Sequence, residues 1–320
     1  MRQTTPICAG CAVHIGDITV TPWLVDHSAP DAFGFLIQHG DKTLFYTGDF
    51  REHGRKEYAF ESMLNKLPPS MTAMIIEGTL LERSNSTYPS ETNVEDTMVD
   101  TFNNEGNLCY VICSSQNIDR LVSVFRAAIR ANRELVIDIY TAWILDLLGH
   151  FHKTTPRMEW TGVRVLAHGP SAGRQYGIIK STPEYFGDFL RRIYANGVAI
   201  KENDLAKNPC KYVFKTNRSL SFVKKFGFDS ATVVYSLWGG YLRPEYGERQ
   251  AKEFAELSSR NDVRFTQIHT SGHADLSTLK RLIQKLNPKS VIPIHTEHKT
   301  KFPEHFDNVL ILEDGVEVAL

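Results

Sequence analysis

Several residues of the chain have side chains that bind metals or move protons. His27, Asp49 and Glu77 each follow an apolar stretch in the first 80 residues, and His273 and His295 do the same near the C-terminus. Zinc and similar metals prefer imidazole and carboxylate ligands. Imidazole, whose pKa lies near neutrality, is also suited to general acid work. This set of residues therefore predicts a metal-dependent hydrolytic site.

The apolar stretches before the first three of these residues are predicted to be β-strands. Residues 18–25, 43–47 and 71–76 are rich in apolar and β-branched side chains, and Gly40-Asp41 is a typical hairpin turn. Functional groups commonly lie in the loops that follow the strands of an α/β sheet. The loops after these strands are therefore the predicted place of the site.

The middle of the chain has a different pattern. Predicted strands alternate with predicted helices, at residues 108–113, 118–131, 135–140, 141–148 and 163–166. This alternation is typical of a parallel α/β unit. We therefore expect residues 1–84 and 236–320 to form one lobe, with residues 85–235 as a second lobe inserted between its two parts.

The last 85 residues return to the pattern of the first part. A helix with apolar residues at helical spacing is predicted over residues 276–286, between strands at 263–268 and 290–294. We expect a βαβ unit, whose right-handed crossover would place both strand ends at one edge of a sheet. His273 and His295 are therefore predicted to share a cleft.

The composition is ordinary for a globular protein, with 42% hydrophobic residues and a net charge of −1. The sequence has no apolar run of membrane-spanning length and no signal-peptide pattern at its start. Its five cysteines are an odd and sparse set, and Cys8-x-x-Cys11 has no second pair to complete a zinc site. A cytoplasmic protein with reduced thiols is therefore expected.

The motifs around the candidate residues resemble those of metallo-β-lactamase-fold hydrolases of the β-CASP subgroup. Residues 25–31 (VDHSAPD) and 46–50 (YTGDF) resemble two metal motifs, and residues 76–79 (IEGT) resemble an acidic motif that follows a buried strand. Residues 269–274 (HTSGHA) and 293–297 (PIHTE) resemble two further motifs. The subgroup includes ribonuclease J and the endonuclease of messenger-RNA 3′-end processing.

Two further segments extend the resemblance over nearly the whole chain. Residues 114–120 resemble the start of the inserted β-CASP lobe, and residues 269–297 resemble the RNA-specificity domain of zinc-dependent metallo-hydrolases. The implied fold is α/β, a partial metallo-β-lactamase αββα sandwich with an inserted parallel α/β lobe. The implied substrate is RNA, with Ser28, His269 and Ser271 as candidate contacts beside the metals.

The resemblance also implies a role for each matched residue. His27 would complete a first zinc site, Asp49 would bridge two zinc ions, and His295 would complete the second site. Glu77 and His273 would form a polar pair beside the metals, in which His273 protonates the leaving oxygen of the phosphodiester. Two metals would activate a water and stabilise the charge that develops on the phosphate.

One motif of the family has no match in this sequence. The family's main metal motif is His-x-His-x-Asp-His, and the only His-x-His here is His150-Phe151-His152, which lacks the rest. Three explanations are open: a truncated or misplaced start, a second polypeptide that supplies the first strands, or a non-catalytic relative. We expect little or no nuclease activity from this chain alone.

A basic segment is the candidate surface for nucleic acid. Residues 190–226 contain nine Lys or Arg and two acidic residues, with aromatics between them. Cations contact phosphates, and aromatic rings stack on unpaired bases. Lys211 and Lys215 are therefore candidate RNA contacts, with a solvated face as the alternative. Asn117 and Arg120 open a helix whose N–H groups favour phosphate, and simple capping is their alternative.

Rival functions and the assembly stay open at this point. The fold hosts many chemistries, so a hydrolase of another phosphoester or ester is one rival. A metal-free binding or regulatory subunit is the other. Arg51, His53 and Arg55 follow Asp49 and are candidates for the entrance of the cleft. The expected assembly is a homodimer, or a complex with a partner chain that supplies the missing strands.

Overall fold

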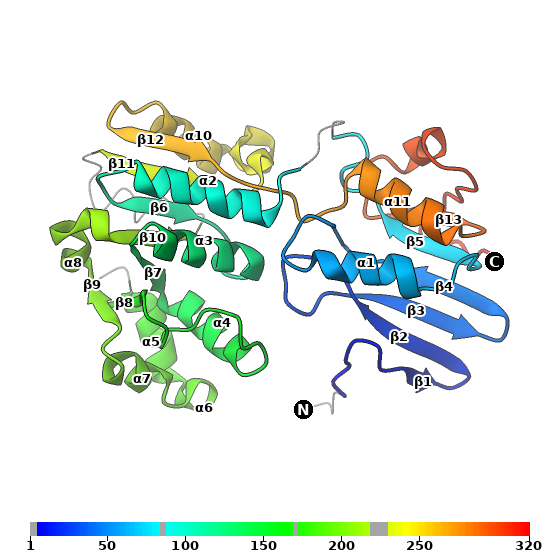
Figure 1. Ribbon diagram of the computed structural model, residues 1–320, viewed down its shortest axis with the longest axis horizontal. Coiled ribbons are helices and arrows are strands. Elements are labelled where there is room, and N and C mark those ends of the chain that lie inside the picture. Colours follow the sequence, from blue (N-terminus) through cyan, green and yellow to red (C-terminus); the bar gives the residue numbers. More distant parts are fainter. Residues whose placement is uncertain (1–4, 84–87, 169–171, 218–229) are drawn as a thin grey trace. The chain divides into compact units, whose positions relative to one another are not determined.

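The computed structural model describes residues 5–83, 88–168, 172–217 and 230–320. Contacts divide the chain into two compact units. We call Met1–Ser90 together with Ser271–Leu320 the split unit, and Glu91–Thr270 the inserted unit. Figure 1 shows that each unit is built from a sheet and the helices packed on it. Among the described residues, no helix has the length and apolar character that crossing a membrane requires.

The split unit contains a six-stranded sheet with the order β1-β2-β3-β4-β5-β13. β1 to β4 form an antiparallel meander, whereas β5 is parallel to β4 and β13 is parallel to β5. The strands are β1 Val13–Ile15, β2 Ile18–Leu24, β3 Phe33–His39, β4 Lys42–Tyr46, β5 Ala73–Glu77 and β13 Val291–Ile294. The helices are α1 Glu57–Lys66, α11 Leu276–Leu286 and the 3₁₀-helix η4 Lys299–Glu304.

The helix α11 anchors the loop that precedes it. Its start is capped by Asp275, whose side chain accepts the N–H of Thr278 at 2.8 Å. Its apolar face shares one hydrophobic core with α1 and with the strands, formed in part by Phe45, Phe60, Met63, Met74, Leu279, Leu282, Leu286 and Val291. The loop before α11, which carries His273, is therefore fixed from one side by this packing.

The inserted unit contains a seven-stranded sheet with the order β12-β11-β6-β10-β7-β8-β9, and all its pairs are parallel. Two separate hydrophobic clusters pack its two faces, so helices cover both. The predicted parallel α/β unit is therefore confirmed. The strands are β6 Cys109–Ile112, β7 Glu134–Asp138, β8 Val163–His168, β9 Ala199–Lys201, β10 Tyr212–Thr216, β11 Ala231–Tyr235 and β12 Val263–Gln267.

The helices of the inserted unit connect these strands. The α-helices are α2 Glu91–Asn103, α3 Ile118–Arg130, α4 Ile139–Gly149, α5 Gly173–Ser181, α6 Pro183–Phe186, α7 Phe189–Ala195, α8 Glu202–Lys207 and α10 Glu248–Ser258. The 3₁₀-helices are η1 Pro209–Lys211, η2 Gly239–Leu242 and η3 Pro244–Tyr246.

The end of the inserted unit differs from the boundary expected at residue 235. β11 pairs with β6, and β12 pairs with β11, so both strands extend the seven-stranded sheet and the unit continues to Thr270. The expected βαβ unit is wrong for the same reason, because β12 belongs to the inserted unit and β13 to the split unit. Apolar patterning identifies a strand but not the sheet that it joins.

The cysteines also depart from expectation at one pair. Cys8 and Cys11 form a disulfide, so the expectation of reduced thiols throughout is wrong for these two residues. Cys109 and Cys113 are free and buried, and Cys210 is free and exposed.

Candidate metal centre

Three strands of the split unit deliver candidate residues to one edge of the sheet. Asp49 follows β4 by three residues, Glu77 is the last residue of β5, and His295 directly follows β13. β5 lies between the other two and is parallel to both, with Ile294 paired to Glu77. Parallel neighbours end at the same edge of a sheet, so the three side chains converge.

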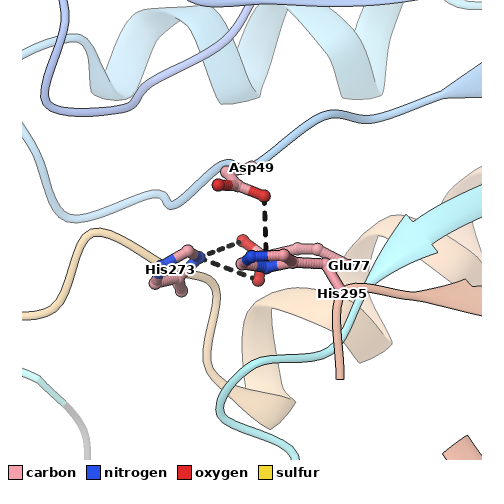
Figure 2. Close-up of side chains that lie close together, drawn as sticks. All are labelled: Asp49, Glu77, His273 and His295. Atoms are coloured by element: carbon pink, nitrogen blue, oxygen red, sulfur yellow. Dashed lines mark hydrogen bonds and ion pairs between the residues drawn. The ribbon is translucent and has the colours of Figure 1, made fainter. Parts of the chain in front are cut away.

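His273 completes a cluster with these three residues, as Figure 2 shows. Potential ligand atoms of Asp49, Glu77, His273 and His295 all lie within 4.8 Å of one another. The structure therefore brings His273 and His295 together, as the sequence predicted. The cause is the pairing of β13 with β5 and the anchoring of the loop before α11, rather than a βαβ crossover.

Asp49 and His295 form the more open side of the cluster. The Nδ1 of His295 lies 3.4 Å from Oδ1 of Asp49 and 2.9 Å from the hydroxyl of Thr79. Gly48 has a φ of 58°, and a Cβ there would lie 2.9 Å from the carbonyl oxygen of Phe33. Only glycine fits this turn without strain, and the turn presents Asp49 at the edge of the sheet.

Glu77 and His273 form the buried side of the cluster. Nδ1 of His273 lies 3.1 Å from Oε2 of Glu77 and 3.2 Å from Oε1, and Oε1 also accepts the backbone N–H groups of Phe50 and Ala274. Burial works to raise the pKa of Glu77, but these hydrogen bonds outweigh it and the pKa lies below its ordinary value. Burial works to lower the pKa of His273, but Glu77 outweighs it and the pKa lies above its ordinary value.

His27 lies beside the cluster rather than in it. Its ring centroid is 5.5 Å from that of His273, and its Nδ1 is 2.7 Å from the carbonyl oxygen of Gly272. A carbonyl only accepts, so Nδ1 carries the hydrogen and Nε2 carries the lone pair. Burial lowers the pKa of His27 below its ordinary value, which favours the neutral, ligand-competent ring.

The donor set has the chemistry that zinc requires. Imidazole nitrogens and carboxylate oxygens are its common ligands, and structural or catalytic sites use three or four of them. Asp49 and His295 are the donors most open to an ion, since their side chains are 36% and 57% exposed. Glu77 is instead committed to backbone N–H groups and to His273. The residues therefore fit a metal site that has few protein ligands.

Comparison with known proteins also points to a zinc-dependent hydrolase. Residues 262–318 match the family model of the Zn-dependent metallo-hydrolase RNA specificity domain. Ribonuclease J of Helicobacter pylori (strain ATCC 700392 / 26695) is 23% identical over 97% of this chain. The chain is thus similar to Zn-dependent metallo-hydrolases in its C-terminal part and to ribonuclease J over nearly its whole length. The resemblance to such metallo-hydrolases that the motifs predicted is confirmed.

Two further proteins are similar to this chain. The chain spans 44% of the length of the Helicobacter ribonuclease J. An uncharacterized protein of Mycoplasma pneumoniae, an MG423 homolog, is 29% identical over 39% of this chain and 23% of its own length. The crystal structure of a protein of unknown function from Enterococcus faecalis V583 is similar with a TM-score of 0.73 at 20% identity, over 100% of this chain and 68% of that chain. That similarity shows the fold alone.

The three residues predicted to contact substrate beside the metal site, Ser28, His269 and Ser271, lie in different surroundings. Ser271 is buried, and its hydroxyl accepts the N–H of His273 at 3.1 Å. His269 belongs to the inserted unit, where its Nδ1 lies 3.4 Å from Nη1 of Arg120. Ser28 is half-buried next to His27. Ser271 thus shapes its own loop, while the role of Ser28 stays a prediction.

Asn117 and Arg120, the candidate phosphate contacts at the start of α3, both have partners within the inserted unit. Asn117 caps α3 by accepting the N–H of Arg120 at 3.0 Å, which is the capping alternative. Arg120 is fully buried and donates to Glu91 at 2.9 Å and to the carbonyl oxygen of Ser236 at 3.1 Å. The structure therefore assigns both residues to the architecture of the inserted unit.

The basic segment divides into a buried and an exposed part. Lys215 is fully buried and its Nζ donates to Ser115, to Thr141 at 2.9 Å and to Asn217 at 2.8 Å, so its predicted contact with RNA is wrong. Lys211 is 49% exposed and stays a candidate. Arg218, Lys224 and Lys225 lie outside the described residues.

Sequence reasoning missed a buried network beneath the site. Arg51 is buried rather than at the entrance of a cleft, and it pairs with Asp26. Gly54 lies against both. The sequence signal was weak, because an Arg two residues after a ligand has the same appearance whether its side chain points to solvent or to the core.

Proposed function

We propose that this chain carries one half of a two-zinc site for the hydrolysis of phosphodiester bonds in RNA, and that it has little or no nuclease activity alone. The observation that carries the proposal is the cluster of Asp49, Glu77, His273 and His295 within 4.8 Å. The match to an RNA specificity domain and the similarity to ribonuclease J support RNA as the substrate class. An RNA substrate favours a cytoplasmic location.

The residues divide into proposed ligands and a proposed acid. Asp49 and His295 are the ligands, with His27 as a third donor through Nε2, because these groups have donor atoms that are not committed to buried partners. A bound metal would supply an activated water and positive charge at the phosphate. His27 lies outside the group of four.

His273 is the proposed general acid. The buried carboxylate of Glu77 holds Nδ1, so the proton that can move is the one on Nε2. The raised pKa of His273 keeps the ring protonated to a higher pH than an ordinary imidazole. Such a ring can donate its proton to the leaving oxygen and then recover it from solvent. Glu77 therefore positions and charges the acid without contacting the substrate.

Further metal ligands are proposed to come from outside this set. The donors described here do not complete two four-ligand zinc sites. We therefore propose that a partner chain, or a second copy of this chain, contributes ligands to the active assembly. A metal-free binding subunit is the alternative, and it would bind RNA equally well with and without a chelator.

Zinc content and cleavage of a labelled single-stranded RNA test the proposal. The purified full chain is expected to bind zinc weakly and to leave the RNA uncut. His295→Ala is expected to lower the zinc content further, whereas His14→Ala, at an exposed histidine of β1, is the matched control. Two tightly held zinc ions together with robust cleavage of the RNA would contradict the proposed half-site. Zinc content that is the same in wild type and His295→Ala would also count against it.

A further inference from the structure

A buried ion pair lies beneath the loops that carry the candidate ligands. Asp26 precedes His27 and is 0% exposed, and Arg51 follows Asp49 by two residues and is 1% exposed. Nε of Arg51 lies 3.6 Å from Oδ1 of Asp26, and the backbone N–H of Arg51 donates to the carbonyl of Asp26 at 2.8 Å. The pair therefore joins the loop after β2 to the loop after β4.

Arg51 also reaches the loop that precedes α11. Its Nη1 donates to the carbonyl oxygen of Ser271 at 2.8 Å, and Nε2 of His53 lies 2.9 Å from the same oxygen. The next carbonyl along the chain, that of Gly272, accepts Nδ1–H of His27 at 2.7 Å. Arg51 thus holds the carbonyl of Ser271, which directly precedes the Gly272 carbonyl that accepts from His27.

Gly54 shows how closely the backbone encloses this pair. A Cβ at Gly54 would lie 2.2 Å from Oδ1 of Asp26 and 2.5 Å from Nε of Arg51. The N–H of Gly54 donates to Oδ2 of Asp26 at 2.8 Å. The position next to the pair therefore has no room for a side chain.

Lys56 adds a second link, which joins the carboxylate of Asp26 to the backbone of the proposed ligand His27. Its Nζ lies 3.8 Å from Oδ1 of Asp26 and donates to the carbonyl oxygen of His27 at 2.7 Å. A buried ion pair is weak evidence for stability, because desolvation offsets much of its attraction. The planar fork of an arginine does, however, hold its partners in fixed directions. Geometry, rather than stability, is the better account of this pair.

We propose that Asp26 and Arg51 are positioning residues that fix the ring of His27 with its hydrogen on Nδ1 and its lone pair on Nε2. Arg51 holds the Ser271–Gly272 peptide, and the carbonyl of Gly272 accepts only Nδ1–H. Nε2 is then the donor offered to a metal, as partners behind a histidine ligand commonly arrange. What this inference says of metal rests on the proposed function, whereas the ring tautomer is a property of the metal-free chain.

Arg51→Lys is the first test variant. It keeps a positive charge beside Asp26 but removes the planar fork that holds Asp26 and the carbonyl of Ser271 in fixed directions. Nitrogen-15 NMR of the imidazoles in the metal-free full chain separates the two tautomers, and His27→Gln assigns the signal. Wild type is expected to show only the Nδ1–H form of His27, and Arg51→Lys a mixture. Lys42→Arg, at an exposed lysine of β4, is the matched control and is expected to match wild type.

Gly54→Ala is the second variant, and it keeps the test decisive if Arg51→Lys does not fold. It removes no charge but places a methyl group against both members of the pair. The same mixture of His27 tautomers is expected. Circular dichroism establishes that each variant compared is folded.

Zinc affinity gives the second readout. Loss of a partner behind a histidine ligand commonly weakens metal binding about 10–100-fold, and we expect this range for Arg51→Lys. A single Nδ1–H tautomer in both variants overturns the inference, and so does an unchanged zinc affinity in a chain whose wild type binds zinc. If wild type binds no zinc while both variants mix the tautomers, the proposed function fails and the positioning role stands.

Discussion

Each unit of the molecule holds a polar cluster near the carboxyl ends of its parallel strands, and the two clusters differ in exposure. In the split unit, Asp49 and His295 are open to solvent. In the inserted unit, Lys215 and Arg120 are fully buried, and their nitrogens are surrounded by acceptors. A strand-end position is therefore not enough to mark a functional group. A group can bind an ion or substrate only where it keeps lone pairs or hydrogens that other groups of the protein do not already occupy.

Arg120→Met tests the buried side of this comparison and has the largest expected effect. The substitution leaves the carboxylate of Glu91 buried without its ionic partner, although Ser123 still donates to it at 2.7 Å. We expect the free energy of unfolding to fall by about 3–5 kcal/mol, measured by urea denaturation. Arg243→Met, at an exposed arginine, is the control and should change it by less than about 0.5 kcal/mol. Equal losses in both variants would contradict the assignment of Arg120 to the architecture.

Lys215→Met is expected to act in the same direction with a smaller effect. Asp138, 3.7 Å from the lysine, keeps the N–H of Thr141 at 2.7 Å and so does not become unpartnered. We expect a loss of about 1–3 kcal/mol in the free energy of unfolding, from buried acceptors left without a donor. RNA affinity of the folded fraction, measured by fluorescence anisotropy, should stay at the wild-type value. A stable variant with weakened RNA binding would restore the original prediction for Lys215.

Glu77→Gln tests the buried Glu77–His273 pair of the split unit through the pH dependence of the free energy of unfolding. The pKa of Glu77 lies below its ordinary 4.5, so its contribution to stability is present above that value and is lost as the pH falls. The pKa of His273 lies above its ordinary 6.5, so its contribution is present below that value and is lost as the pH rises. The difference in unfolding free energy between wild type and Glu77→Gln should therefore be largest between pH 4.5 and 6.5.

Chemical denaturation across this range, with a chelator present, measures that difference. Glu52→Gln, at a carboxylate of the same unit that is paired with Arg281, is the control for the removal of one negative charge. A difference for Glu77→Gln that does not vary with pH would show that the Glu77–His273 pair is not charged in the folded chain.

Lys211→Glu has the smallest expected effect on stability. Lys211 is 49% exposed and lies 3.2 Å from Glu134, so its loss should change the free energy of unfolding by less than about 1 kcal/mol. If Lys211 contacts a phosphate, RNA binding weakens and the slope of log affinity against log salt falls by about 1. If RNA affinity and its salt dependence are both unchanged, Lys211 does not contact a phosphate.

The strands and the cluster residues were predictable from sequence because both leave local signals. Apolar, aromatic and β-branched residues mark β4, β5 and β13, and the motifs at their ends mark Asp49, Glu77 and His295. The sheet that a strand joins was not predictable, since β12 has the same pattern in either unit. Pairing between distant segments decides that, and no short window contains it.

The burial of single charged side chains could also not be predicted from the sequence. Lys215 stands in a run of basic and aromatic residues that matches a nucleic-acid surface, yet β10 is an inner strand and all its residues are buried. Arg51 is a second example, because it was expected at the entrance of a cleft but is buried and joins three loops. In both, the partners come from segments far away in the chain, so the outcome depends on the completed fold.

Zinc titration of the metal-free full chain against a competing chelator, with X-ray absorption at the zinc edge, tests most directly whether the open cluster is a metal site. The expected result is weak zinc binding by oxygen and imidazole nitrogen donors that is lost in both Asp49→Ala and His295→Ala. Zinc that binds with unchanged affinity in these two variants would contradict the site.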